Sequence, residues 1–136
     1  INQKILSFLP NSKNLIDLSG QTSIQELMSH IATLDLFLTN DSGSMHIAAC
    51  FEIPTLTIFG PTDDTETSPF HSKNASIISL KTLHKPLPCQ PCKKRICPLP
   101  KNSPTFHACM IDLKPESVIE KLQLLLTKIP QKEDLT

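Results

Sequence analysis

The first two-thirds of the chain alternates between helical and extended hydrophobic patterns. Apolar residues at helical spacing predict a helix ending near Leu9, a helix opened by a Ser23–Glu26 capping box, and a helix of small residues over 44–51. Short apolar runs bounded by turn residues predict strands at 15–18, 36–39, 55–59 and 75–80. Strands that alternate with helices are typical of the α/β class, so the sequence predicts a parallel sheet with flanking helices.

The last third follows a different pattern. Residues 86–104 contain six of the twelve prolines, which excludes a helix or an inner strand there, so we expect an ordered but irregular loop. A final helix is expected over 115–128, with Pro115 in its first turn, where proline is favoured. The 136 residues are about one domain long, and no apolar run reaches the roughly 18 residues that a membrane span needs.

Ligands of parallel sheets bind at the carboxyl ends of the strands, which here are residues 40–43 and 60–64. The first segment runs directly into a helix, whose first N–H groups have no partner within the helix and can bind an anion such as phosphate. Gly43 would let a phosphate approach the backbone closely. Asp41 would either cap the helix or bind a sugar hydroxyl, and His46 would lie one turn further along. A plain capping turn with a partly buried histidine is the alternative interpretation.

Three segments of the chain carry a recognisable pattern: residues 39–49 read Thr-Asn-Asp-Ser-Gly-Ser-Met-His-Ile-Ala-Ala, residues 53–55 read Ile-Pro-Thr, and residues 59–63 read Phe-Gly-Pro-Thr-Asp. In this order they resemble glycosyltransferase family 9, the ADP-heptose:lipopolysaccharide heptosyltransferases. The later segment from Cys89 to Met110 resembles the heptosyltransferase II branch of the family. The resemblance covers most of residues 20–126.

The resemblance implies a GT-B enzyme with two Rossmann-like domains, of which residues 1–136 would be the incomplete C-terminal, donor-binding domain. It implies inverting transfer of heptose from ADP-heptose to the lipopolysaccharide inner core, without a required metal or other cofactor. A carboxylate base on the N-terminal domain would deprotonate the acceptor. The donor-binding residues that it implies are Thr22 near the adenine, Asp41, Ser42, Gly43 and His46 around the diphosphate and heptose, and Thr62 and Asp63 at the next strand end.

The chain departs from the family pattern in two ways. The N-terminal acceptor domain and the first strand of the C-terminal domain are absent from it, so we expect no catalytic residue within it and no activity from it alone. Glu52 stands where the family usually has the glycine that ends a helix, which predicts local strain. The alternative function is a truncated module that binds a nucleotide or zinc without catalysis.

Four cysteines lie in a Cys/Pro-rich basic segment, residues 84–110, at C-x2-C-x4-C-x11-C spacing. Four thiolates can bind a structural Zn²⁺ tetrahedrally, and an irregular loop would gain order from it. His107 is an alternative ligand, and the alternatives to a metal are a disulfide or reduced cysteines packed as small apolar residues. Redox catalysis is disfavoured, because a thioredoxin-like site needs a helix directly after its cysteine pair. The four are Cys89, Cys92, Cys97 and Cys109, and a fifth, Cys50, is expected in the core.

The formal net charge of zero conceals two oppositely charged parts. Residues 67–111 hold seven Lys and Arg and no acidic residue, while the rest of the chain carries all 13 acidic residues. Lys93, Lys94 and Arg95 would form a solvated face, a nucleic-acid patch or an acceptor-side surface. Nucleic acid is not expected, because the chain has no Trp or Tyr for base stacking. The family context favours the anionic lipopolysaccharide acceptor, with peripheral contact at the cytoplasmic face of the inner membrane.

Overall fold

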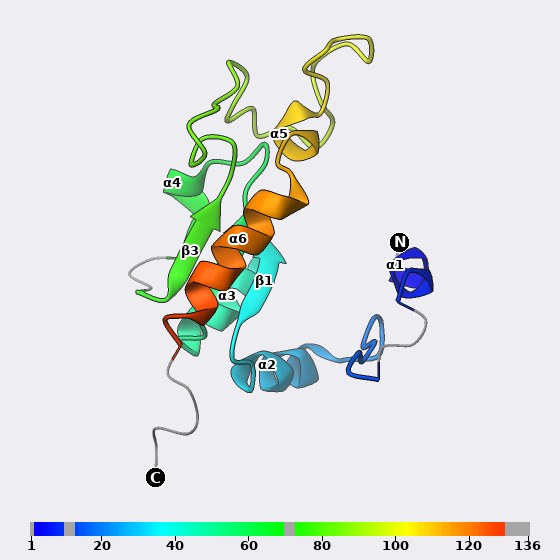
Figure 1. The fold of residues 1–136 in the computed structure, drawn as a ribbon, viewed down its shortest axis with the longest axis vertical. Helices are drawn as coiled ribbons and strands as arrows, with labels where there is room; N and C mark the ends of the chain where they lie inside the picture. The colour runs from blue at the N-terminus through cyan, green and yellow to red at the C-terminus, as the bar shows by residue number, and fades with distance from the viewer. Residues whose placement is uncertain (1, 10–12, 70–72, 130–136) are drawn as a thin grey trace.

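Three short parallel strands form the centre of the fold. The structure is a computed structural model that describes residues 2–9, 13–69 and 73–129. Strands β1 (Phe37–Asn40), β2 (Thr55–Ile58) and β3 (Ala75–Ile78) form one sheet in the order β1-β2-β3 (Figure 1). Both pairings are parallel, with Asn40 beside Ile58 and Ile58 beside Ile78. The predicted α/β class with a parallel sheet is confirmed.

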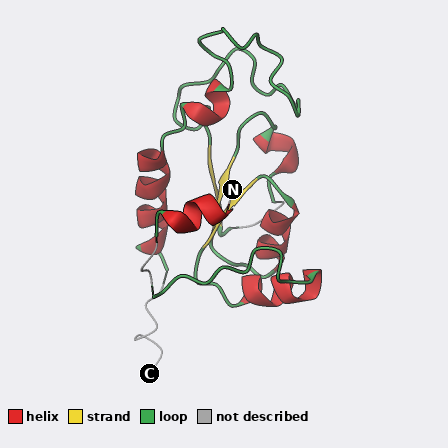
Figure 2. Ribbon diagram, turned by 90° about the vertical axis from the view of Figure 1, so that its right-hand side faces the viewer, coloured by secondary structure: helices red, strands yellow, loops and turns green. Residues whose placement is uncertain are grey.

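Helices cover both faces of the sheet (Figure 2). Helix α6 (Pro115–Leu126) lies on one face, and helices α2 (Ile24–Ala32) and α3 (Gly43–Cys50) lie on the other. Because successive strand residues point to opposite faces, two separate apolar clusters form. The α6 cluster contains Leu56, Ile78, Leu80, Leu113 and Val118, and the α2–α3 cluster contains Ile31, Ala48 and Ile53.

The predicted helix starts are confirmed. The Ser23 N–H donates to Glu26 Oε2 at 2.7 Å, and the Glu26 N–H donates to Ser23 Oγ at 3.3 Å, which completes the capping box of α2. Pro115 stands in the first turn of α6. A first helix, α1 (Asn2–Ser7), lies away from the sheet (Figure 1). Two short helices that the pattern did not predict, α4 (Asp64–Thr67) and α5 (Ala108–Ile111), stand on either side of the proline-rich loop.

The prediction of a strand at residues 15–18 is wrong. The hydrogen bonds of this segment are local, because the Asp17 carbonyl accepts from the Gln21 side-chain amide at 3.0 Å and the Leu18 carbonyl accepts from the Gln21 N–H at 3.1 Å. An apolar run becomes a strand only where a neighbouring strand pairs with it. Ile16 is instead 82% exposed.

The strain expected at Glu52 is present. Glu52 has a φ of 56°, in the left-handed region that favours glycine. Its N–H donates to the Ala49 carbonyl at 3.1 Å, and the Ile53 N–H donates to the Ala48 carbonyl at 3.0 Å. These are the two hydrogen bonds of a Schellman motif, which usually has glycine at this position. Helix α3 therefore ends with a backbone conformation that glycine usually adopts, although the residue is glutamate.

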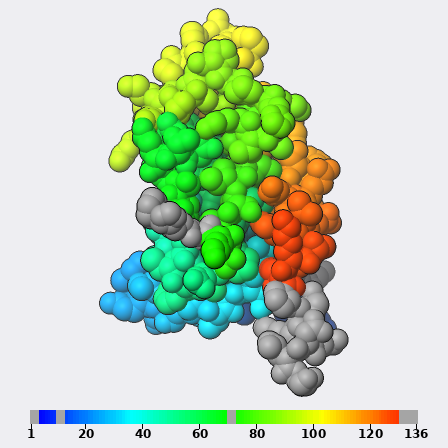
Figure 3. Space-filling model, turned by 90° about the vertical axis from the view of Figure 1, so that its left-hand side faces the viewer, coloured from blue at the N-terminus to red at the C-terminus, as the bar shows by residue number. Residues whose placement is uncertain are grey.

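The carboxyl ends of the strands lie at the same end of the molecule as the proline-rich loop. The space-filling view shows residues 84–107, coloured yellow-green to yellow, at this end, and the blue α2 segment at the opposite end (Figure 3). The edge at which the sequence predicts a ligand is therefore next to the cysteine-containing loop.

Candidate functional site

Two turns meet at the carboxyl edge of the sheet. The register of β1 and β2 places Asn40 beside Ile58, and the Asp41 N–H donates to the Ile58 carbonyl at 3.2 Å. Residues 40–43 and 60–64 therefore leave the sheet from adjacent points. This confirms that the two segments predicted at the carboxyl ends of the strands lie at one edge of the sheet.

Helix α4 follows the second turn, residues 60–64, and is hydrogen-bonded to the first turn, residues 40–43. The Thr67 hydroxyl lies 3.0 Å from Asp41 Oδ2 and 3.0 Å from the Asp63 carbonyl oxygen. Asp63 caps α4 and accepts hydrogen bonds from the Thr65 hydroxyl at 2.7 Å and the Thr65 N–H at 3.1 Å. These hydrogen bonds lower the pKa of Asp63, so its side chain is a carboxylate at neutral pH. Sequence reasoning missed Thr67, because its hydrogen-bond partner Asp41 lies 26 residues away in the chain.

The N-terminus of α3 is left without a side-chain cap. Ser42 is the N-cap residue, but its side chain makes no capping hydrogen bond. Among the described residues, the N–H groups of Gly43 and Ser44 have no hydrogen-bond acceptor. The hydroxyls of Thr39, Ser42 and Ser44 lie 2.8 to 3.3 Å from one another. The segment is therefore not the plain capping turn of the alternative interpretation, because its amides remain available.

The space in front of this helix end is open. A Cβ atom built on Gly43 meets no atom within 4 Å. Free amides and the positive end of a helix dipole, facing open space, are what an anion such as a diphosphate needs.

Acidic side chains outnumber basic ones at this edge. Lys81 Nζ lies 2.7 Å from Asp64 Oδ1, and Lys93 Nζ lies 2.6 Å from Glu66 Oε1 and 3.9 Å from Asp63 Oδ2. The hydrogen bond to Asp64 raises the pKa of Lys81, and that to Glu66 raises the pKa of Lys93. Both lysines are therefore neutralised by neighbours, and an anionic ligand would be held by backbone N–H groups rather than by net positive charge.

The remaining predicted donor residues differ in their positions. His46 is exposed in the first turn of α3, so the alternative of a partly buried histidine is wrong. Thr62 and Asp63 line a small cavity of about 50 Å³ beside Gly60. Thr22 is not brought to this edge, because α2 begins two residues later and lies at the opposite end of the sheet (Figure 1). A role for Thr22 near an adenine stays a prediction.

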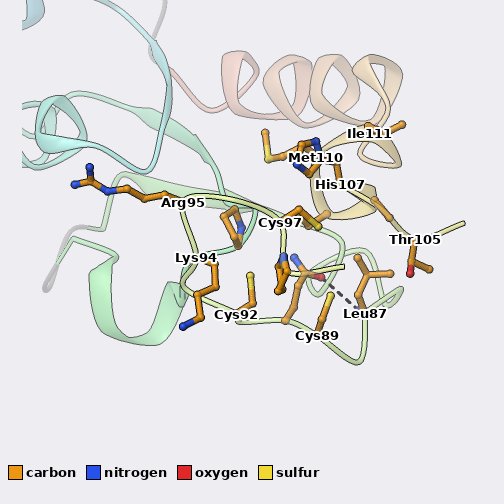
Figure 4. Close-up of a pocket in the computed structure, with 15 residues that line it drawn as sticks. Leu87, Cys89, Cys92, Lys94, Arg95, Cys97, Thr105, His107, Met110 and Ile111 are labelled. Atoms are coloured by element: carbon orange, nitrogen blue, oxygen red, sulfur yellow. Dashed lines mark hydrogen bonds between the residues drawn. The ribbon is translucent and has the colours of Figure 1, made fainter. Parts of the chain in front are cut away.

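A cavity of about 240 Å³ lies beneath the proline-rich loop. Its walls include all four cysteines of the predicted metal site together with His107 (Figure 4). Cys89, Cys92, Cys97 and Cys109 are half-buried free thiols. Burial raises the pKa of Cys109, and the other three thiols raise it further. In residues 2–9, 13–69 and 73–129, no three His, Cys, Asp or Glu side chains are arranged as metal ligands.

The loop is attached to the second turn of the carboxyl edge. Gln90 Nε2 donates to the Gly60 carbonyl at 2.7 Å, and the Lys93 N–H donates to the Pro61 carbonyl at 2.8 Å. The cysteine cavity and the two turns of the carboxyl edge are thus parts of one end of the molecule. No sequence pattern predicts this contact of Gln90, because its partner Gly60 lies 30 residues away in the chain.

The basic run of Lys93, Lys94 and Arg95 does not form one continuous positive surface. Lys93 is paired with Glu66, so only Lys94 and Arg95 stay exposed without an ion pair among the described residues. Both side chains point away from the thiols in Figure 4. The acceptor-side surface expected from three residues is therefore reduced to two.

The prediction that Cys50 lies in the core is wrong, because its side chain is exposed at the end of α3. The buried face of α3 is set by Met45 and Ala48. Cys50 is two residues beyond Ala48, so it is turned by roughly 200° around the helix and points away from the core.

Comparison with known proteins places these features in a family context. Residues 2–102 match glycosyltransferase family 9 (heptosyltransferase). The chain is 46% identical over 111 residues to lipooligosaccharide heptosyltransferase 2 of Campylobacter jejuni, which covers 82% of this chain and 32% of that protein. It is 32% identical over 132 residues to the Haemophilus influenzae protein of that name, covering 94% of this chain and 35% of that protein.

A solved structure agrees with the sequence comparisons. The structure of Escherichia coli ADP-heptose lps heptosyltransferase II superposes with a TM-score of 0.57 at 28% identity, covering 82% of this chain and 27% of that one. The chain thus spans about a third of the length of the relatives it matches.

Proposed function

Because this chain belongs to glycosyltransferase family 9, the heptosyltransferases, we propose that it forms the donor-binding part of an enzyme that transfers heptose from ADP-heptose to the lipopolysaccharide inner core. The relatives are named for heptose transfer, and the structural neighbour is also named for ADP-heptose. The observation that carries the proposal is the uncapped N-terminus of α3, which opens at the carboxyl edge of a parallel sheet within the matched residues.

The N–H groups of Gly43 and Ser44 would bind the donor diphosphate, assisted by the hydroxyls of Ser42 and Ser44. In the transfer, an acceptor hydroxyl oxygen bonds to the anomeric carbon, the bond from that carbon to the β-phosphate oxygen breaks, and ADP leaves with the electron pair. Negative charge grows on the diphosphate in the transition state, so N–H donors already aimed at it lower the barrier. This leaving-group role needs no metal ion.

The heptose would lie beside the two aspartates of the edge. Asp41 and Asp63 each accept hydrogen bonds from a threonine of α4, which leaves further lone pairs on each carboxylate for sugar hydroxyls. The exposed His46 would approach the same ligand from α3. We assign no catalytic base to this chain, and we expect the base from the rest of the full-length enzyme, since the relatives are about three times as long.

The acceptor would approach from the side of the proline-rich loop. Lys94 and Arg95 offer unpaired positive charge to an anionic lipopolysaccharide core. None of the helices in the described part of the chain is long and apolar enough to cross a bilayer. We propose peripheral contact of the full-length enzyme with the cytoplasmic face of the inner membrane.

Isothermal titration of the full-length protein with ADP, UDP and GDP tests the donor assignment. ADP should bind most tightly, and incubation with ADP-heptose and a heptose-deficient core should increase the acceptor mass by one heptose. Binding of ADP without transfer would support the non-catalytic module instead. Equal affinity for all three nucleotides would refute the donor assignment.

A further inference from the structure

Residues 84–107 form a long segment that adds one half-buried side chain, Leu87, to the α6 cluster. None of these residues is buried, and the segment contains neither helix nor strand. Ordering a backbone costs roughly 1–2 kcal/mol per residue, so long loops without helix or strand are uncommon in compact domains. Hydrogen bonds join the segment to the sheet edge at Lys85, whose N–H donates to the Leu80 carbonyl at 2.8 Å, and at Gln90 and Lys93. The rest of the segment needs another source of order.

Four thiols are placed so that a crosslink between them would order the rest of this segment. Cys89, Cys92 and Cys97 belong to the loop, whereas Cys109 belongs to α5 on the other side of the segment. All four line one cavity of about 240 Å³ (Figure 4). A ligand shared by these side chains would join the loop to α5 and close the cavity.

The Cys89–Cys92 pair lies on a tight turn. The Gln90 N–H donates to the Leu87 carbonyl at 3.0 Å, and Lys93, directly after the pair, has a left-handed φ of 53°. The chain therefore reverses at the pair, and the two sulfur atoms lie on the cavity side of the turn in Figure 4. Two cysteines separated by two residues are the usual half of a structural zinc site.

The charge around the thiols suits an anionic metal centre. Zn²⁺ bound by four thiolates has a net charge of −2, and zinc is the common divalent ion with this ligand set and tetrahedral geometry. Residues 67–111 contain no acidic side chain and seven basic ones. Lys94 and Arg95 also line the cavity, although their side chains point away from the thiols. A segment without carboxylates adds no repulsion to the bound thiolates.

We propose that Cys89, Cys92, Cys97 and Cys109 bind one structural Zn²⁺, which fixes the basic loop against the carboxyl edge of the sheet. The thiols share a cavity but are not arranged as ligands in this structure, so binding requires rotation of their side chains and a closing shift of the loop. Each thiol releases its proton to solvent as its sulfur bonds to zinc, and no electron is transferred. His107 also lines the cavity but stays outside the proposed set, because four thiolates complete a tetrahedral site. The proposal does not depend on the transferase activity.

Metal analysis of the full-length protein, purified without chelators, tests this site. We expect about one zinc per chain in the wild type, and less than half of that in Cys92→Ser and Cys109→Ser. Cys50→Ser is the matched control, because it removes an exposed thiol outside the loop and should keep the zinc. Zinc absent from the wild type, or equal in all variants, would overturn the proposal. Retention of zinc by Cys97→Ser together with its loss from His107→Ala would overturn the proposed ligand set.

Cobalt substitution of the wild type gives the same answer without depending on how well the variants fold. A tetrahedral four-thiolate site should show intense visible bands and sulfur-to-cobalt charge transfer in the near ultraviolet. A thiol reagent should then modify Cys50 readily and the other four only after a chelator is added. A weak octahedral cobalt spectrum, or an intact mass reduced by two hydrogens because a disulfide has formed, would refute the zinc site.

Discussion

Replacing Gly43 with valine places two methyl groups at the N-terminus of α3, where the donor diphosphate is proposed to bind. The space there is open in the folded protein, and Gly43 does not have a left-handed φ. Valine has a helix propensity a few tenths of a kcal/mol better than that of glycine. The substitution should therefore leave the fold intact and obstruct only the ligand.

The expected size of the effect follows from the two free amides. The N–H groups of Gly43 and Ser44 are the donors available to a phosphate at this helix end. A hydrogen bond to a charged group contributes about 1.5–3 kcal/mol, so loss of one should weaken ADP binding by about 10- to 150-fold. Gly43→Ala adds a single methyl group and should produce a smaller loss.

Isothermal titration of the full-length variants with ADP measures this effect, and urea unfolding verifies that they are folded. Gln123→Val is a suitable control, because it introduces the same side chain at an exposed position of α6. Its Kd for ADP should equal that of the wild type. If Gly43→Val is stably folded and binds ADP with unchanged affinity, the N-terminus of α3 is not the diphosphate site.

Three further predictions concern stability and the acceptor. Glu52→Gly should raise the free energy of unfolding in urea by about 0.5–1 kcal/mol, because the left-handed conformation costs a non-glycine residue about 1–2 kcal/mol, of which the added chain entropy of glycine offsets part. Glu52→Ala should bring no such gain, and equal gains would contradict the strain. Thr57→Val should stabilise by about 1 kcal/mol, because Thr57 Oγ1 is buried without a hydrogen-bond partner, whereas a lower urea midpoint would show that the hydroxyl is bonded. Changing Lys94 and Arg95 to glutamine should raise the acceptor KM and flatten its dependence on salt, and an equal loss of ADP affinity would argue against an acceptor role.

Local features of this fold were accessible from the sequence because they depend on residues close together in the chain. The Ser23–Glu26 capping box, Pro115 in the first turn of α6 and the strand-like run at 55–58 each act over a few positions. The strain at Glu52 was predicted instead from the resemblance to the family, which usually has glycine at this position. The placement of the two turns at one edge followed from the prediction of parallel strands, and the register of β1 and β2 makes them neighbours.

Other features were decided by partners that are distant in sequence. Residues 15–18 have a strand-like composition but no strand to pair with, so they form local hydrogen bonds instead. Lys93 belongs to a basic run, yet Glu66, 27 residues earlier, neutralises it. Cys50 is apolar in the sequence pattern but is turned away from the sheet by the orientation of α3.

The sequence by itself determined the α/β class and the position of the turn that leads into α3, because helix caps, apolar spacing and turn residues act within a few positions of one another. Only the tertiary structure decided that α3 lacks a side-chain cap, that Thr67 joins Asp41 to the second turn, and that four thiols share one cavity. Those features depend on which side-chain rotamers and loop contacts satisfy the polar groups once the sheet has brought distant segments together, and no local pattern specifies that outcome.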